Sequence, residues 1–249
     1  MSSGLTPSLT VGDTGRMTSS AERVAAVHAW RSAVDVGEAT VLPDGCMDVI
    51  WTGDGLLFAG PDTRPNVFVA HQPHEMVGLR FFPGHAQGLL GVPAVELRDL
   101  RVEADTLWQR PRVERWCELL EASDDKVATL AELCTADRHT APPPWSWHLV
   151  DILRRRVGVA ECAAELSVTE RTLHRMSLQY FGYGAKTLGR ILRMRNAMSV
   201  LGDEDLSAVA HRTGYADYAH MFREFVALAG APPTAFVPPV ADAAQLRAQ

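Results

Sequence analysis

Two short stretches of the sequence carry arginine and histidine at the spacing at which side chains share one face of a helix. Arg171, His174 and Arg175 lie in the first stretch, and His220 and Arg223 lie in the second. Residues three or four apart are neighbours on a helix surface. Arginine can donate two hydrogen bonds to O6 and N7 of guanine, worth about 1–3 kcal/mol of discrimination. The chemistry that these residues predict is the reading of base pairs in double-stranded DNA.

The segments around these side chains predict two helix-turn-helix units. Such a unit needs a small residue where its helices cross and an apolar residue inside the turn. Ala163 and Val168 meet these needs in the first unit, and Ala210, Gly214 and Tyr215 meet them in the second. Gly214 can take the positive φ that the turn favours.

Inside each second helix, apolar residues are expected to anchor the helix to the core. Leu173 has this role in the first unit, and Met221, Phe222 and Phe225 have it in the second. The residues expected to point outward and read bases are Arg171, His174, Arg175, Tyr218, Ala219, His220 and Arg223.

Two further residues are predicted to lie at the DNA phosphates. Thr169 and Asp217 stand at the N-cap positions of the two reading helices, where their side chains can accept backbone hydrogen bonds. The helices predicted for this part of the chain span 146–156, 159–166, 169–181, 185–201, 206–213, 217–229 and 233–236.

The first half of the chain has a different pattern, with short apolar runs separated by turn residues. The runs are expected to be strands over 40–42, 47–51, 56–58, 67–69 and 76–82, after a helix or strand lead-in over 21–30. Turn residues at near-regular intervals between them predict an antiparallel meander or a small barrel.

A short helix is expected over 85–90, and residues 102–107 are expected to lead into a longer helical region over 111–120 that continues over 127–134. Val113, Trp116, Cys117 and Leu120 recur at steps of three and four residues and form one apolar face. That face either packs inside the domain or forms a homodimer contact.

The overall prediction is an α+β protein of two domains, in which a β-rich sensor-like domain precedes an all-α tandem helix-turn-helix domain. The expected divisions are a disordered leader over 1–20, the first domain over 21–139, a Pro-rich linker over 140–145, the DNA-binding domain over 146–238 and a tail over 239–249.

Charge is distributed unevenly between the two parts. The net charge is −6, with 12 basic and 20 acidic residues in 1–144 but 12 basic and 10 acidic residues in 145–249. The positive balance therefore falls where phosphate contacts are expected. The sequence contains no apolar stretch of the length of a membrane span and no secretory signal, so a cytoplasmic protein is expected. The four scattered cysteines are expected to be reduced thiols.

Residues 150–238 resemble the DNA-binding domain of AraC/XylS-type transcription regulators. The resemblance is carried by Ala163 through Arg175, by Gly182 and Arg190–Arg193, and more closely by Ala210 through Phe225 with Gly230, Pro233 and Phe236. Ser167 stands where the family usually has glycine and Ala185 where it often has proline, so a slightly strained first turn is expected. The resemblance implies a regulator that docks its two units in successive major-groove segments of DNA, with RNA polymerase as a further partner. It also implies that the helix around Arg190 joins the two units, and that Arg190 and Arg193 contact DNA phosphates.

Three segments of the first half are similar to a β-rich domain of unknown role found before such DNA-binding modules: 42–48, 58–61 and 78–84. The resemblance implies that this domain senses a small-molecule effector or dimerises. A pocket is conceivable around Trp51, Phe58, Arg80 and Phe82, although these residues suit a core equally well.

The alternative prediction is a metal-dependent β-barrel enzyme joined to a DNA-targeting module. Cys46, His71, His74 and His85 suggest such a site, but solvated or hydrogen-bonded histidines are the expected state. We therefore expect no metal, no cofactor and no catalytic residue.

Overall fold

The computed structural model describes residues 27–34, 36–71, 74–137 and 141–238 of the chain. The expected leader over 1–20 and tail over 239–249 lie outside the described residues. The described strands are β1 (Val27–Val34), β2 (Gly37–Val41), β3 (Met47–Trp51), β4 (Leu56–Ala59), β5 (Asn66–Ala70), β6 (His74–Phe81) and β7 (Arg101–Glu103).

The helices of the first half are short, except for two that stand together at its far end. They are α2 (Gln87–Leu90), the 3-10 helix η1 (Ala94–Leu97), α3 (Ala104–Leu107), α4 (Arg110–Glu121) and α5 (Lys126–Ala136). The second half contains α6 (Pro144–Arg154), α7 (Val159–Glu165), α8 (Glu170–Phe181), α9 (Ala185–Met198), α10 (Leu206–Thr213), α11 (Tyr218–Ala229) and η2 (Pro233–Phe236).

The strands form a five-stranded sheet in the order β1-β6-β3-β4-β7 and a two-stranded sheet of β2 and β5. All pairs are antiparallel, as expected. The prediction of a simple meander is wrong, because among the described strands only β3 and β4 are sequential neighbours that pair. A tight turn over 53–55 closes that hairpin, with Thr52 N donating to Gly55 O at 3.0 Å. The other pairs join strands that are distant in the chain.

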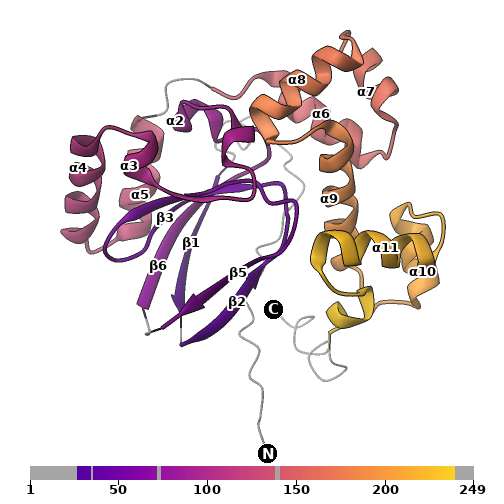
Figure 1. The fold of residues 1–249 in the computed structure, drawn as a ribbon, viewed down its shortest axis with the longest axis horizontal. Helices are drawn as coiled ribbons and strands as arrows, with labels where there is room; N and C mark the ends of the chain where they lie inside the picture. The colour runs from indigo at the N-terminus through magenta and orange to yellow at the C-terminus, as the bar shows by residue number, and fades with distance from the viewer. Residues whose placement is uncertain (1–26, 35, 72–73, 138–140, 239–249) are drawn as a thin grey trace, which may run out of the picture.

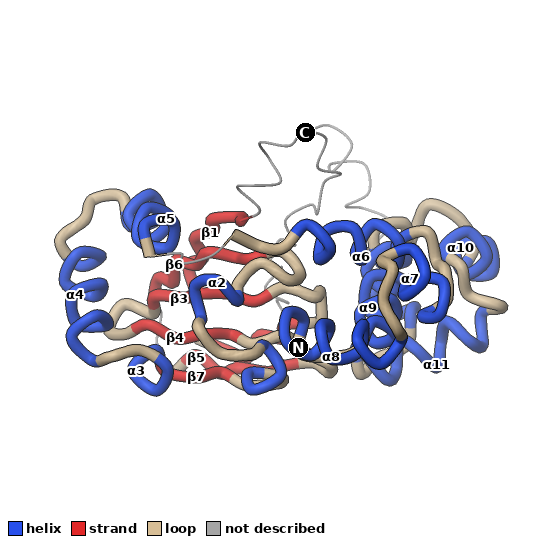
Figure 2. Tube along the Cα trace, turned by 90° about the horizontal axis from the view of Figure 1, so that it is seen from above, coloured by secondary structure: helices blue, strands red, loops and turns tan. Residues whose placement is uncertain are grey.

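One face of the larger sheet forms the core of the first half. Val49, Leu79 and Phe81 point to one face of the sheet from β3 and β6 and are almost fully buried. Figures 1 and 2 place α4 and α5 against the end of the sheet that is farthest from α6–α11. The ring of Trp108 lies 4.7 Å from Phe58 and links the sheet to these helices.

The apolar face predicted for α4 packs inside the domain. Trp116 and Leu120 are buried there, and Val113 and Cys117 pack at the edge of the same core. The ring of Trp116 lies 4.9 Å from Trp108. This packing accounts for the periodicity without a second copy of the chain.

The second half is built around α9, which joins two helical groups in Figure 1, with α7 and α8 at one end and α10 and α11 at the other. Leu188, Ile191, Met194 and Ala197 are fully or almost fully buried along one side of α9. The expected single connecting helix is therefore present, and it sets the positions of both helix-turn-helix units.

The proline segment contributes to the fold in a way that the sequence pattern did not predict. The expected linker over 140–145 ends two residues early, because α6 begins at Pro144, which lies at a helix position where its missing N–H is not needed. Trp145 packs its ring 5.1 Å from Tyr180 and 5.9 Å from Phe181. The end of the proline segment is thus fixed to the DNA-binding half.

The cysteines and the helices can each be compared with what the sequence predicts. Cys46, Cys117, Cys134 and Cys162 are free thiols, as predicted. Burial raises the pKa of Cys46 well above its ordinary value. Among the described helices, none combines the length and the apolar character that crossing a membrane would require.

Candidate nucleic-acid interface

The two predicted turns have the same backbone hydrogen bond. Val168 N donates to Ala163 O at 2.9 Å in the first unit, and Tyr215 N donates to Ala210 O at 2.9 Å in the second. Both alanines are buried where the helices cross. The sequence repeat is therefore a structural repeat, with α7 and α8 as one helix-turn-helix unit and α10 and α11 as the other.

Each turn contains one residue in the left-handed backbone region. Gly214 has φ +87° in the second turn, where a Cβ would meet the side chain of Arg156. Ser167 has φ +55° in the first turn. A side chain in this region costs about 1–2 kcal/mol. The expected strain of the first turn is confirmed.

Replacing Ser167 with glycine is expected to raise the free energy of unfolding by up to about 1 kcal/mol. Relief of the left-handed conformation outweighs the chain entropy that glycine adds, which costs about 0.5–1 kcal/mol. Urea denaturation of the full chain measures the change. Ser199→Gly is the matched control, because Ser199 is exposed with φ −68° and should lose stability on the same replacement. An equal loss of unfolding free energy in both variants would contradict the view that the backbone is strained at Ser167.

Side chains at the start of α8 point into solvent as predicted. Arg171, His174 and Arg175 are exposed, and neither arginine forms an ion pair with another described residue. Thr169 accepts a hydrogen bond from Thr172 N at 3.1 Å and so begins the helix. The guanidinium groups of Arg171 and Arg175 are thus available to a ligand.

Two of the expected readers on α11 are turned toward their own unit. His220 accepts a hydrogen bond from Ala216 N at 3.3 Å through Nδ1, and its ring lies 5.3 Å from the ring of Tyr215. Tyr218 is half-buried and contacts the ring of Phe222. Ala219 and Arg223 are exposed, so the free reading surface of α11 is centred on them.

Phe222 is placed differently from the prediction. It was expected to anchor α11 inward, but 41% of the residue is exposed. Met221, Phe225 and Leu228 fill the core face instead. Because successive helical residues are about 100° apart, these three share a face that Phe222 cannot reach. The same spacing in the sequence could have placed Phe222 on the outer surface.

Glu224 is a functional residue that the sequence prediction missed. It is only 8% exposed, and it accepts a hydrogen bond from Arg190 Nε at 2.7 Å and from Arg193 Nη2 at 2.9 Å. Arg193 also lies over the Tyr215 ring, 4.9 Å from its centre. This cluster fixes α9 to α11.

The arginine pair was predicted to contact phosphate, and that role stays a prediction. Both guanidinium groups already have a carboxylate partner, and their side chains are only 31% and 23% exposed. Asp217, assigned to the same set, accepts a hydrogen bond from His220 N and begins α11. Burial raises the pKa of the Tyr215 hydroxyl beside this cluster, so the group stays neutral.

The four residues of the conceivable pocket do not enclose one cavity. Trp51 and Phe58 lie in the apolar core, on the sheet face covered by helices. Arg80 follows Leu79 on β6 and pairs with Asp48 across the strands, so it lies on the opposite face. Phe82 lies after the end of β6, at the boundary with the second half.

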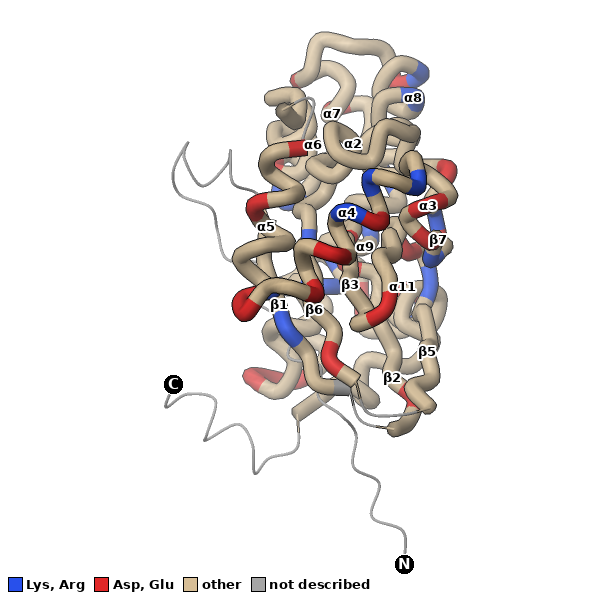
Figure 3. The backbone as a smooth tube through the Cα atoms, turned by 90° about the vertical axis from the view of Figure 1, so that its left-hand side faces the viewer, with Lys and Arg blue, Asp and Glu red and all other residues tan. Residues whose placement is uncertain are grey.

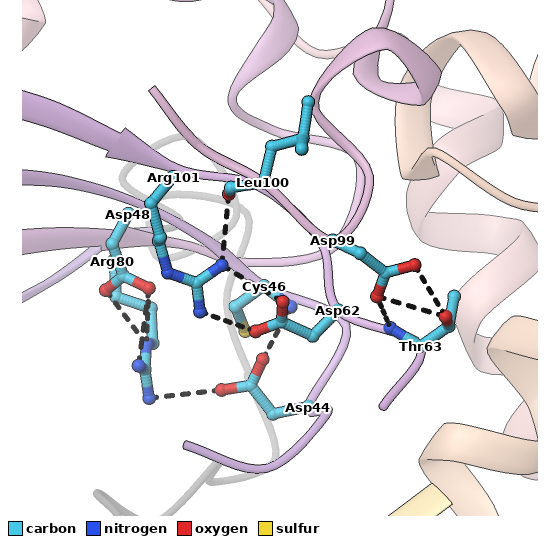
Figure 4. Close-up of polar contacts among 9 residues, drawn as sticks. All are labelled: Asp44, Cys46, Asp48, Asp62, Thr63, Arg80, Asp99, Leu100 and Arg101. Atoms are coloured by element: carbon cyan, nitrogen blue, oxygen red, sulfur yellow. Dashed lines mark hydrogen bonds and ion pairs between the residues drawn. The ribbon is translucent and has the colours of Figure 1, made fainter. Parts of the chain in front are cut away.

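Arg80 instead lies in a polar cluster, shown in Figure 4. Its guanidinium lies 3.1 Å from a carboxylate oxygen of Asp44 and 3.1 Å from one of Asp48. Trp30 donates an indole hydrogen bond to Asp48 at 2.9 Å. Burial raises the pKa of Asp48, and the positive charge of Arg80 opposes that shift.

A second ion pair lies beside the first. Arg101 forms two hydrogen bonds with Asp62, at 3.0 and 2.7 Å. Asp99, at φ +59°, accepts a hydrogen bond from Thr63 N at 2.6 Å. These contacts hold together the loops at the edge of the sheet that faces the DNA-binding half (Figures 1 and 4).

The two halves contact each other closely at three glycines. A Cβ on Gly182 would lie 2.5 Å from Pro61 Cγ, and one on Gly84 would lie 2.7 Å from the Phe181 ring. A Cβ on Gly45 would contact Leu188 at 3.4 Å. The three N-terminal segments singled out in the sequence therefore converge on the turn between α8 and α9.

A groove of about 1370 Å³ runs along α9 next to this contact. Both halves line it, with Leu42, Asp44, Cys46 and Phe82 on the N-terminal side. The basic residues along its opposite side are Arg154, Arg156, Lys186, Arg190, Arg193 and Arg195. The acidic residues of α4 and α5 lie in the part of the molecule that faces the viewer in Figure 3, at the far end from α9 in Figure 1.

The residues of the metal alternative are not assembled into a site. His85 is buried with its ring 3.6 Å from that of Trp147, while Cys46 lies beside the Arg80 cluster. His71 and His74 flank residues 72–73, which fall outside the description. Within the described part of the chain, no group of three or more histidine, cysteine or acidic residues is arranged to hold a metal ion.

Comparison with known protein families gives a separate match for each half of the chain. Residues 162–237 match a family described as a helix-turn-helix domain, and residues 23–103 match a domain of unknown function (DUF6597). No curated protein matches the chain.

Among solved structures the chain is similar to ToxT from Vibrio cholerae. One ToxT structure has a TM-score of 0.45 at 9% identity, covering 85% of this chain and 98% of that one. Another has a TM-score of 0.46 at 8% identity and covers 85% and 97%. ToxT bound to an unsaturated fatty acid has a TM-score of 0.43 at 11% identity and covers 85% and 94%.

The family match over residues 162–237 assigns DNA binding to the second half of the chain. AraC-type regulators are not enzymes, so the alternative of a metal-dependent enzyme is set aside. The tandem helix-turn-helix architecture agrees with the residues matched. The chain is a DNA-binding transcription regulator with an AraC-type helix-turn-helix domain, preceded by a domain of the DUF6597 family.

Proposed function

We propose that the N-terminal domain controls DNA binding through its direct contact with the first reading helix. The observation that supports this proposal is the close approach of Pro61 to Gly182, the residue that ends α8. A movement of the N-terminal loops would be transmitted to α8 without an intermediate element. We place the division between the two domains in the predicted Pro-rich linker, directly before α6, which begins at Pro144.

The proposed base contacts come from both units. Arg171, His174 and Arg175 act from α8, while Arg223 and Ala219 act from α11, with Tyr218 and His220 at its edge. Thr169 and Asp217 lie at the helix N-termini, where free backbone N–H groups favour phosphate. Arg190 and Arg193 would contact phosphate only through the parts of their guanidinium groups that Glu224 leaves free.

We also propose that a small-molecule effector occupies the groove along α9. The groove combines the apolar side chains of Leu42, Phe82 and Leu192 with several arginines, which suits a ligand with an apolar body and an anionic group. Occupation of the groove would alter the spacing between Leu42 and α9. We place the protein in the cytoplasm beside the chromosome, with RNA polymerase as a partner and a homodimer as a second route of control.

Arg223→Ala is expected to relax base preference at one position of the bound site, at a cost of about 1–3 kcal/mol for the preferred base pair. The reason is the loss of a two-hydrogen-bond contact to guanine. The measurement is selection of bound sequences from a random duplex library by the full chain, followed by affinity measurements on single-base variants.

Arg115→Ala is the matched control, because Arg115 is an exposed arginine on α4, away from both reading helices. It should leave base preference unchanged. If Arg223→Ala weakens binding to every sequence equally, Arg223 contacts phosphate and the base-reading assignment is wrong.

A further inference from the structure

Helix α11 exposes two large apolar side chains on its outer surface. Phe222 is 41% exposed and Val226 is 43% exposed. They are four residues apart and therefore neighbours on the helix. Ala219 and Arg223 are exposed on the same side.

These side chains do not serve the core of the domain. Met221, Phe225 and Leu228 occupy the buried face of α11, where their exposed fractions are 2% or less. Among the described aromatic rings, Phe222 contacts that of Tyr218, with 6.2 Å between ring centres. The Tyr218 contact leaves much of the Phe222 residue in solvent, since 41% of it is exposed.

We propose that Phe222, supported by Val226, is a specificity-determining residue that packs against the C5-methyl group of a thymine next to the base pair read by Arg223. Phenylalanine is one of the side chains that contact the thymine methyl group in the major groove, and its ring reaches farther from the helix than a methyl side chain does. This inference rests on the proposed role of α11 in reading bases.

The surroundings of the patch favour DNA over a protein partner. Glu224 is the one acidic residue within α11, and it is buried and paired with two arginines, so the outer face of the helix presents no carboxylate to a phosphate backbone. The patch consists of little more than one phenylalanine and one valine. A stable protein contact buries on the order of 1,200 Å² or more, whereas a thymine methyl group needs only one such side chain.

A uracil scan of the bound site tests the proposal. A duplex selected from a random library by the full-length protein is prepared with each thymine replaced singly by uracil, which removes only the methyl group. We expect binding to weaken by a factor of about four at one or two positions adjacent to the Arg223 base pair, the effect of one buried methyl group. With the Phe222→Ala variant, the same substitutions should have no effect.

Two controls accompany the scan. Leu119→Ala removes an equally exposed apolar side chain from α4 and should leave the uracil sensitivity intact. Phe222→Leu keeps an apolar side chain at this position and should retain part of the uracil sensitivity. Far-ultraviolet circular dichroism and urea denaturation check that α11 stays folded in each variant.

The proposal is overturned if the wild-type scan is flat, or if Phe222→Ala keeps the same sensitivity at the same positions. It is also overturned if Phe222→Ala leaves DNA binding unchanged but alters the sedimentation of the protein, since the patch then contacts another copy. If the wild-type protein selects no sequence at all, the base-reading role of α11 fails as well. If the wild-type protein binds a specific sequence but the uracil scan is flat, only the proposed role of Phe222 is wrong.

Discussion

Replacing Glu224 with glutamine is expected to lower the free energy of unfolding by about 2–3 kcal/mol and to weaken specific DNA binding by about tenfold or more. The carboxylate is the shared partner of Arg190 and Arg193, at 2.7 and 2.9 Å. Glutamine keeps the shape and one acceptor oxygen but leaves two neighbouring cations without an anion. The lower end of the range for buried pairs applies, because the arginine side chains are 31% and 23% exposed.

The loss of binding follows from the position of the ion pairs. They join α9, which connects the two units, to α11, the proposed second reading helix. When they break, the second reading helix loses its fixed angle to the first. Urea denaturation gives the stability change, and titration of the selected duplex gives the affinity.

Glu165→Gln provides the control for a carboxylate removed from a more exposed pair. Glu165 pairs with Arg155 on the surface and has a side chain that is 32% exposed. Surface pairs are worth about 0–1 kcal/mol, so stability should barely change. If Glu224→Gln stays as stable as Glu165→Gln and still binds its site, the cluster does not fix α11.

Gly182→Ala is expected to destabilise the full chain by about 2–4 kcal/mol and to separate the regulatory domain from α8. Gly182 has φ +80°, and a Cβ there would lie 2.5 Å from Pro61 Cγ and 3.1 Å from the Ala94 carbonyl oxygen. The substitution therefore adds strain to the helix end and also pushes the N-terminal loops away. Limited proteolysis should show faster cleavage between α5 and α6, alongside the change in urea midpoint.

Gly91→Ala separates these two effects. Gly91 also ends a helix, with φ +78°, but a Cβ there would meet nothing within 4 Å. It should cost only the left-handed penalty of about 1–2 kcal/mol and leave cleavage between the domains unchanged. Equal behaviour of the two variants would mean that the contact at Gly182 does not hold the domains together.

Local signals in the sequence predicted the DNA-binding half well. Helix α10 spans Leu206–Thr213 as expected, because Asp205 caps its start and Gly214 ends it. Helices α8 and α11 begin one residue after their caps, Thr169 and Asp217. Each of these signals lies within a few residues of the helix end that it specifies.

The sheet could not be predicted to the same degree. The approximate strand positions followed from short apolar runs between turn residues, but β6 lies between β1 and β3, and β2 pairs with β5. Such pairings join residues that are far apart in the chain and leave no local signal. For the same reason, β1 was predicted only as a helix or a strand lead-in, and β7 was not predicted as a strand.

The site shows a similar limit. Arg171, Arg175 and Arg223 could be identified because exposed residues on a helix follow from its periodicity. Glu224 was missed because its role depends on two arginines contributed by α9. The residues predicted to line a pocket around Trp51 do not lie together. Alternate residues of a strand face opposite sides of the sheet, so Arg80 lies on the face opposite to Trp51.

The central claim is that the tandem units of the full chain read a specific DNA sequence, and footprinting tests it most directly. The full-length protein is incubated with the DNA upstream of its own gene and neighbouring genes at near-physiological salt. We expect a discrete protected site with contacts in two major-groove segments about one helical turn apart, bound at least about a thousandfold more tightly than random DNA. Uniformly weak binding with no protected site would contradict the account.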